Sequence, residues 1–196
     1  MNDIKISEDG GTVTFTEKRR INIVEDLYAE SPREWDNLST ILAFHKRYNL
    51  NEAKNCPCNE RNYDKELVSE YVDGIVKDGG YIVELYIYDH SGIKLSTGGF
   101  SCGWDSGRVG FIIVTKEKLV ESNLDVTKDL AKIKEIISNE LEIYNDYLIG
   151  NCYRIIDNAS EIDCGGYIGS DGYDAAVAEI ESYGLLEYLD LDYRLD

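Results

Sequence analysis

The spacing of apolar residues predicts the secondary structure of the first quarter of the chain. Residues 10–24, GGTVTFTEKRRINIV, alternate apolar and polar side chains, which predicts a strand or hairpin at an edge of the fold. In residues 30–50, Ser31 and Pro32 form a plausible helix start, and the positions from Trp35 to His45 follow helical spacing. We therefore expect a short helix after the first strands.

Two further segments have the periodicity of amphipathic helices. Residues 51–62 are polar and are expected to form the loop before the first of them, residues 64–80, which a Gly-Gly pair ends. In residues 127–150 apolar side chains recur every three or four positions along one face. Thr127 is the expected N-cap of this helix, and Gly150 the expected stop.

The middle of the chain is rich in β-branched and aromatic residues. Residues 81–99 contain two β-rich runs joined by the turn DHSG, and residues 109–114 add a third, which together predict an antiparallel meander. Residues 152–169 show a similar pattern, which we interpret as a second hairpin that follows the same turn rules. A last helix is expected over residues 171–183.

These elements predict an α+β fold in which antiparallel hairpins or a meander pack against several helices. The 196 residues, 43% of them hydrophobic, are enough for one sizeable core, so a single domain over residues 1–196 is expected. Residues 1–30 are a candidate peripheral arm, and residues 170–196 an acidic C-terminal helix and tail. The start of the chain lacks the pattern of a secretion signal, so a cytoplasmic location is expected.

Charge is the strongest global signal, because the chain has 38 acidic and 20 basic residues and a net charge of −18. Such a chain repels nucleic acid and anionic membranes, so direct binding to either is not expected. The excess is uneven, since residues 135–196 hold 15 acids and only two bases. The five cysteines are an odd number in a chain that does not need disulfides, and we expect free thiols.

The stretch FSCGWDSGRVGFIIV, residues 100–114, concentrates reactive and turn-forming residue types. The structural interpretation is a tight connection between strands, in which glycines permit special backbone conformations, Trp104 is a packed lid and Cys102 is buried. The residues assigned to this shaped motif are Asp89, Ser91, Gly92, Trp104, Asp105, Ser106 and Gly107.

A catalytic interpretation uses Cys102 as the nucleophile, His90 as the base and Asp105 or Asp89 as the orienting group, because an ordinary thiol needs a basic neighbour. No P-loop, dinucleotide fingerprint or serine nucleophile elbow is present, and the chain has only two histidines. An enzyme is therefore the second choice, and no cofactor is expected.

Metal binding has little support in the sequence. Cys56, Cys58 and His45 offer three ligands, but zinc sites space paired cysteines by two or more residues and no second pair follows. A carboxylate site from Asp89, Asp105 and Asp163 lacks an EF-hand pattern. We expect no metal.

The clustered acids suggest a surface that imitates nucleic acid, although a solvated face that only aids solubility is the alternative. Three acids of the helix over residues 127–150 span about 16 Å, where duplex DNA would present about nine or ten charges. A nucleic-acid mimic therefore requires the C-terminal segment to fold beside that helix. Tyr183, Tyr188 and Tyr193 would then either contact the partner or cover the protein core. The predicted partner-binding residues are Glu135, Glu142, Asp146, Asp171, Asp174, Glu179, Glu181, Glu187, Asp190 and Asp192.

The blocks WDNLSTILAFHKRYNL, YIYDHSGIKLSTGGFSCGWDSGRVGFIIVTKEK and ELEIYNDYLIGNCY resemble a group of small accessory proteins of bacteriophages and mobile elements. The DHSG and WDSG blocks are the specific part, and the group has Pro where this chain has Gly103. No catalytic residue can be transferred from it. The resemblance implies an anti-defence context, in which inhibitors of restriction and CRISPR nucleases are frequent.

The sequence therefore favours a phage-encoded protein that inhibits a host nuclease, with a CRISPR effector as the leading target, through an acidic surface in the bacterial cytoplasm. The partner would be the basic nucleic-acid groove of that nuclease. The alternative is a cysteine-dependent hydrolase or modifier of a defence component that uses Cys102, His90 and Asp105. The oligomeric state is left open.

Overall fold

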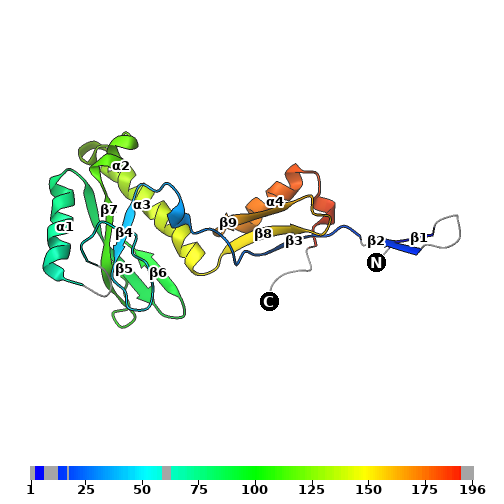
Figure 1. The fold of residues 1–196 in the computed structure, drawn as a ribbon, viewed down its shortest axis with the longest axis horizontal. Coiled ribbons are helices and arrows are strands. Elements are labelled where there is room, and N and C mark those ends of the chain that lie inside the picture. The colour runs from blue at the N-terminus through cyan, green and yellow to red at the C-terminus, as the bar shows by residue number, and fades with distance from the viewer. Residues whose placement is uncertain (1–2, 7–12, 17, 59–62, 191–196) are drawn as a thin grey trace. The chain divides into compact units, whose positions relative to one another are not determined.

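The computed structural model describes residues 3–6, 13–16, 18–58 and 63–190 (Figure 1). The chain divides into two compact units, one made of residues 1–30 and 150–196 and the other of residues 31–149. Helices and antiparallel sheets occur in both, which confirms the α+β class. The single-domain organisation stays a prediction.

A four-stranded antiparallel sheet forms the centre of the second unit, in the order β4-β7-β5-β6. Its strands are β4 (Thr40–Ala43), β5 (Tyr81–Asp89), β6 (Ile93–Ser96) and β7 (Ser106–Val114). The hairpin of β5 and β6 is confirmed, but β7 returns to the far side of β5, so the order is not that of a meander. The outer edge of β6 is occupied by Asn145, whose side chain both donates to Leu95 O (2.9 Å) and accepts from Leu95 N (2.7 Å).

The helix expected over residues 30–50 does not form, and strand β4 lies within this range instead. Only a 3-10 turn, η1 (Pro32–Glu34), forms there, with Ser31 as its N-cap as expected. Ile41, Leu42 and Ala43 are all buried, because this strand is covered on both faces. A strand covered on both faces has a continuous apolar run, and such a run cannot be distinguished from a helix by periodicity.

Helices cover both faces of this sheet. The helices α1 (Lys65–Lys77) and α3 (Val126–Leu148) lie on opposite sides of it (Figure 1), and α2 (Lys116–Glu121), which was not expected, precedes α3. Ile133 and Ile137 of α3 join the larger core cluster, whereas Val68 of α1 joins a smaller one. The N-cap of α3 is Asp125 and not Thr127, since the Asp125 carboxylate accepts from Thr127 N (2.8 Å).

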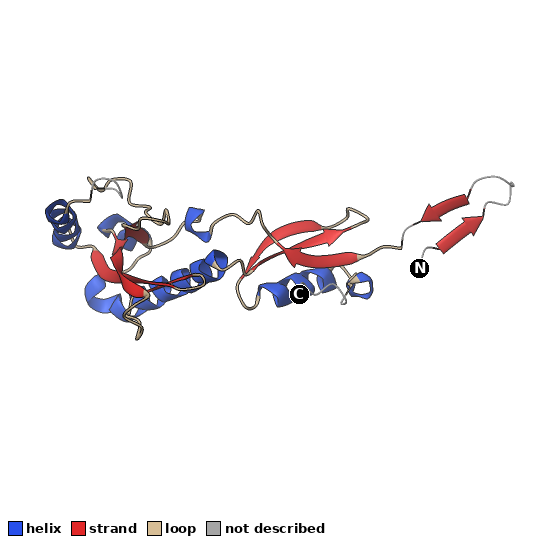
Figure 2. Ribbon diagram, turned by 90° about the horizontal axis from the view of Figure 1, so that it is seen from below, coloured by secondary structure: helices blue, strands red, loops and turns tan. Residues whose placement is uncertain are grey.

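The other unit contains a three-stranded antiparallel sheet and one main helix. Its strands β3 (Ile21–Glu25), β8 (Cys152–Asp157) and β9 (Asp163–Ile168) are arranged in the order β3-β8-β9. Helix α4 (Gly172–Ser182) packs along one face of this sheet (Figure 2), and the 3-10 turn η2 (Leu186–Tyr188) follows. The hairpin expected over residues 152–169 is confirmed, since β8 pairs with β9. Residues 10–24 contain two strands that do not pair with each other, because β2 (Val13–Thr16) pairs with β1 (Asp3–Ile6) and β3 pairs with β8.

No helix in the described part of the chain combines the length and the apolar character needed to span a bilayer. All five cysteines are free thiols, as expected, and Cys58 and Cys152 are buried.

Candidate functional site

The structure brings together the three residues of the catalytic interpretation at one end of the four-stranded sheet. The Asp105 carboxylate lies 3.4 Å from His90 Nδ1 and 3.7 Å from Cys102 Sγ. Asp89 N donates to Asp105 O (2.7 Å), which fixes the connection before β7 against the end of β5. Asp105 therefore stands between the thiol and the imidazole.

This order does not suit a nucleophilic cysteine. A cysteine nucleophile needs the imidazole next to the sulfur and the carboxylate behind the imidazole, whereas here the negative charge of Asp105 is the group beside the Cys102 sulfur. The His90 side chain is 63% exposed, so its contact with Asp105 is a solvent-screened one. The geometry gives His90 no position from which it could take the thiol proton in this structure.

The neighbouring Asp89 is a structural anchor for the segment after β4. Its carboxylate accepts hydrogen bonds from the Arg47 guanidinium and from Tyr48 Oη (3.1 Å), and it lies 3.8 Å from His45 Nε2. The His45 ring stacks on Tyr48 with centroids 4.9 Å apart. Both histidines of the chain are thus paired with an aspartate, and neither contacts the thiol.

The shaped-turn interpretation needs three corrections. Cys102 is half-buried and not a buried apolar group. Trp104 is 98% exposed and is not a packed lid. Gly103, Gly107 and Gly110 do not have left-handed backbone, which occurs instead in the DHSG turn at Ser91 (φ 57°) and Gly92 (φ 137°). Gly110 is required for another reason, since an added Cβ would lie 1.9 Å from Leu42 O on the neighbouring strand β4.

The metal interpretation finds no geometric support. Within residues 3–6, 13–16, 18–58 and 63–190, no group of three or more His, Cys, Asp and Glu side chains could hold a metal ion. Burial raises the pKa of the Cys56 thiol, which is the opposite of what a thiolate ligand requires.

The predicted partner-binding acids fall into both units. Glu135 and Glu142 are exposed on α3, and Asp146, one turn further on, is half-buried and has an interaction partner. The acids of the other unit that are exposed are Asp171, Asp174, Glu181 and Glu187, while Glu179 and Asp190 are half-buried. Asp192 and Tyr193 lie outside the described residues. A single patch made from both sets stays a prediction.

Along α4 the acids form a regular line, which we call the α4 acidic stripe: Asp171, Asp174 and Glu181. The intervals of three and seven residues place these side chains on one side of the helix, with the exposed Ala178 in the gap. The stripe is about 15 Å long by the rise of an α-helix. It lies opposite Ala176 and Ile180, which are buried against the sheet.

The two tyrosines described near this stripe differ in their surroundings. Tyr183 is 57% exposed, and the negative charge of Glu179 raises its pKa. Tyr188 is half-buried under the Arg19 guanidinium, 5.4 Å from the ring centroid. Tyr183 is therefore available as contact area, whereas Tyr188 helps to cover the core.

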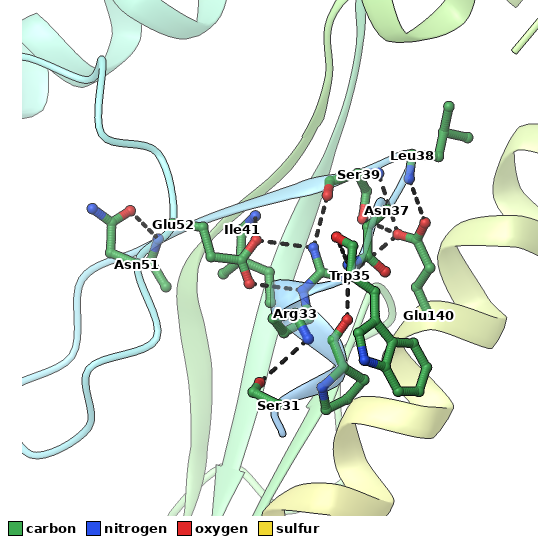
Figure 3. Close-up of polar contacts among 12 residues, drawn as sticks. Ser31, Arg33, Trp35, Asn37, Leu38, Ser39, Ile41, Asn51, Glu52 and Glu140 are labelled. Carbon is green, nitrogen blue, oxygen red and sulfur yellow. Dashed lines mark hydrogen bonds and ion pairs between the residues drawn. The ribbon is translucent and has the colours of Figure 1, made fainter. Parts of the chain in front are cut away.

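A buried ion cluster that the sequence did not reveal ties η1 and β4 to α3 (Figure 3). The Arg33 guanidinium donates to Glu52 through Nε (2.7 Å) and Nη2 (2.9 Å), and lies 3.4 Å from Glu140. Glu140 also accepts from Leu38 N (2.6 Å), Ser39 N (3.2 Å) and Ser39 Oγ. Although burial opposes its charge, the two carboxylates raise the pKa of Arg33.

This cluster is structural, because its charges are paired with one another and with the backbone. Glu52 accepts from Ile41 N (2.9 Å), and the Asn51 side chain accepts from Ala43 N (3.3 Å). These side chains occupy the outer edge of β4, where free N–H groups would otherwise invite pairing with another strand. The cluster could not be predicted from a local motif, because its three charged residues, Arg33, Glu52 and Glu140, are far apart in the sequence.

Comparison with known proteins adds no family to this description. No protein-family model, no curated protein and no solved structure matches the chain.

Proposed function

We propose that this chain is a non-enzymatic anti-defence protein of phage or mobile-element origin, which blocks a bacterial nuclease in the cytoplasm. Its α4 acidic stripe would occupy the basic groove that normally binds nucleic acid, and a CRISPR effector is the first target to test. The single observation that carries the proposal is the line of exposed carboxylates on α4, in a segment that contains no compensating base.

The distribution of charge supports this choice of surface. The unit that contains α4 has 18 acidic and 6 basic residues, a net charge of −12 in 77 residues, whereas the other unit has 20 acidic and 14 basic residues. Residues 155–190 contain nine acids and no lysine or arginine. A basic groove would therefore meet a surface of one sign, as electrostatic complementarity requires.

The spacing of the stripe resembles a single strand more than a duplex. One nucleic-acid strand carries a charge about every 3.4 Å, so about four charges span the 15 Å of the stripe, whereas a duplex carries about nine. Asp171, Asp174 and Glu181 supply three, and Glu179 lies at the flank. We therefore expect the blocked groove to be one that holds one strand, with Glu135, Glu142 and Asp146 of α3 as additional contacts.

The test is a charge reversal with a matched control. The stripe variant Asp171→Lys, Asp174→Lys, Glu181→Lys should raise the concentration needed to inhibit cleavage by purified CRISPR effectors or restriction nucleases more than about tenfold. The control variant Glu66→Lys, Glu70→Lys, Asp73→Lys changes the net charge equally on α1 and should inhibit like the wild type. Equal inhibition by all three folded proteins would remove the stripe from the proposal.

The cysteine-dependent enzyme is separated from this proposal by a second pair of variants. Cys102→Ala and His90→Ala should leave inhibition unchanged, because neither residue belongs to the stripe and Asp105 stands between them. Loss of inhibition at an unchanged melting temperature, together with inactivation of the target at substoichiometric amounts, would favour catalysis instead.

A further inference from the structure

A cavity of about 320 Å³ lies in the second unit, at the end of the sheet face that α1 covers. Its walls come from the end of β4, from β7, and from residues at and before the start of α1. The lining residues are Phe44, His45, Lys46, Tyr63, Val68 and the β7 residues 108–111. This volume is at the lower end of the range for small-molecule sites, which is about 300–1,000 Å³, so it suits one small ligand.

The lining of this cavity is opposite in charge to the protein as a whole. Among the described residues no acidic side chain lines it, whereas Lys46 and Arg108 do, in a chain with nearly twice as many acids as bases. Arg108 donates through Nη1 to Glu84 (2.5 Å), and hydrogen bonds from Tyr86 and Arg108 lower the pKa of that carboxyl. Lys46 is exposed, and its ammonium group forms no hydrogen bond or ion pair with a residue in the described part of the chain.

Aromatic rings supply the rest of the wall. Phe44 and Tyr63 meet edge to face with centroids 5.0 Å apart, and the Arg108 guanidinium lies over the Phe111 ring, 5.5 Å from its centroid. Val68 adds a buried apolar surface. Flat ligands stack on such rings and on guanidinium planes, while ammonium and guanidinium groups bind phosphate.

The His45 side chain is turned toward other partners. Its Nδ1 accepts from Arg47 N and Tyr48 N (both 3.3 Å), and its Nε2 faces Asp89 at 3.8 Å. Nδ1 is thus occupied and Nε2 faces a carboxylate, so the cations of the described lining are Lys46 and Arg108, of which Arg108 also pairs with Glu84.

We propose that this cavity binds a mononucleotide, with the base against the aromatic wall and the phosphate at Lys46 and Arg108. A planar anion matches the combination of rings and cations, which a purely apolar ligand would not use. The net charge of −18 repels a polynucleotide, whereas a mononucleotide carries at most about two charges. The site is independent of the α4 acidic stripe and does not rest on the proposed anti-defence function.

The experiment is an NMR titration of the ¹⁵N-labelled full chain with AMP and UMP. The amide signals of Gly110 and Phe111 are monitored at each ligand concentration. Adenosine, uridine, inorganic phosphate and a single-stranded oligonucleotide are titrated in parallel. Saturable shifts of these two signals with AMP or UMP, together with weaker binding of each nucleoside and of phosphate, are expected. No saturable shift at about 10 mM would overturn the site, and tighter binding of the oligonucleotide would overturn its size limit.

Matched lysine variants test whether the phosphate is recognised where proposed. Lys46→Gln should weaken nucleotide binding roughly tenfold, because a charge-assisted hydrogen bond to phosphate is lost. Lys132→Gln removes another exposed lysine, from α3, and should leave the affinity unchanged. Lys46 is exposed, so its variant should fold, and equal affinity of the two variants would refute the assignment.

Discussion

Replacing Glu140 by Ala tests the conclusion that the Arg33, Glu52 and Glu140 cluster holds the fold of the second unit. The Glu140 side chain is 12% exposed and accepts from two amides, Leu38 N and Ser39 N, which belong to buried residues. Alanine would leave both amides and the Ser39 hydroxyl without this acceptor. Arg33 would keep Glu52, so the loss comes mainly from the amides.

The expected loss is large but leaves the unit folded. A buried donor left unpaired costs about 1–3 kcal/mol, so the two amides together predict about 2–6 kcal/mol. A unit of 119 residues has a free energy of unfolding of about 6–18 kcal/mol at typical values per residue. Glu140→Gln keeps one carbonyl oxygen as an acceptor and should lose about half as much.

Urea unfolding monitored by tryptophan fluorescence measures this loss, because both tryptophans of the chain lie in this unit and Trp35, beside η1, is only about half exposed in the folded state. With a slope of about 2 kcal/mol per molar urea, the midpoint should fall by about 2 M for Glu140→Ala. The control is Glu142→Ala, an exposed neighbour on α3 whose loss should cost less than about 0.5 kcal/mol. A loss below about 1 kcal/mol for Glu140→Ala would refute the structural role.

Three further predictions concern the rest of the structure. Burial opposes the charge of Asp157, but Arg19 and two backbone amides outweigh burial and lower the pKa of this carboxyl. The charged carboxylate therefore stabilises the fold above about pH 3.9, and this stabilisation is lost as the pH falls below that value. Asp157→Asn should make stability less dependent on pH between about pH 4 and 2, in acid unfolding monitored by far-UV circular dichroism. Gly110→Ala should cost at least about 2 kcal/mol in urea because of Leu42 O, whereas Gly107→Ala, with open space around its Cβ, should cost less than about 0.5. Ala178→Glu fills the gap in the stripe and should strengthen inhibition of cleavage; weaker inhibition would contradict the stripe.

The elements with regular periodicity could be predicted from the sequence. Helices α1, α3 and α4 and the hairpins of β5 with β6 and β8 with β9 were predicted because each has one buried face or a clear turn. Strand β4 could not be predicted, because both of its faces are buried and its sequence therefore does not alternate between apolar and polar residues. Strand β7 pairs with β5 and not with the outer edge of β6, because Asn145 occupies that edge of β6. This contact joins residues 50 positions apart, so no local sequence pattern indicates it.

The candidate sites were less accessible to sequence reasoning. Charge counting located the acidic segment, and helical spacing in α4 then allowed the stripe to be recognised. Exposure of Trp104 and the position of Asp105 between His90 and Cys102 depend on side-chain packing, which spacing alone does not define. The aromatic cavity combines residues from three separate elements and has no motif.

The most direct test of the acidic stripe is the salt dependence of binding to an inhibited nuclease. The dissociation constant of the wild type should rise steeply between about 50 and 500 mM salt, because screening weakens contacts between exposed charges. The variant Asp171→Lys, Asp174→Lys, Glu181→Lys should bind weakly with a shallow slope, while the α1 control keeps the wild-type slope. Tight binding that is insensitive to salt, or equal slopes for the wild type and the stripe variant, would contradict the account.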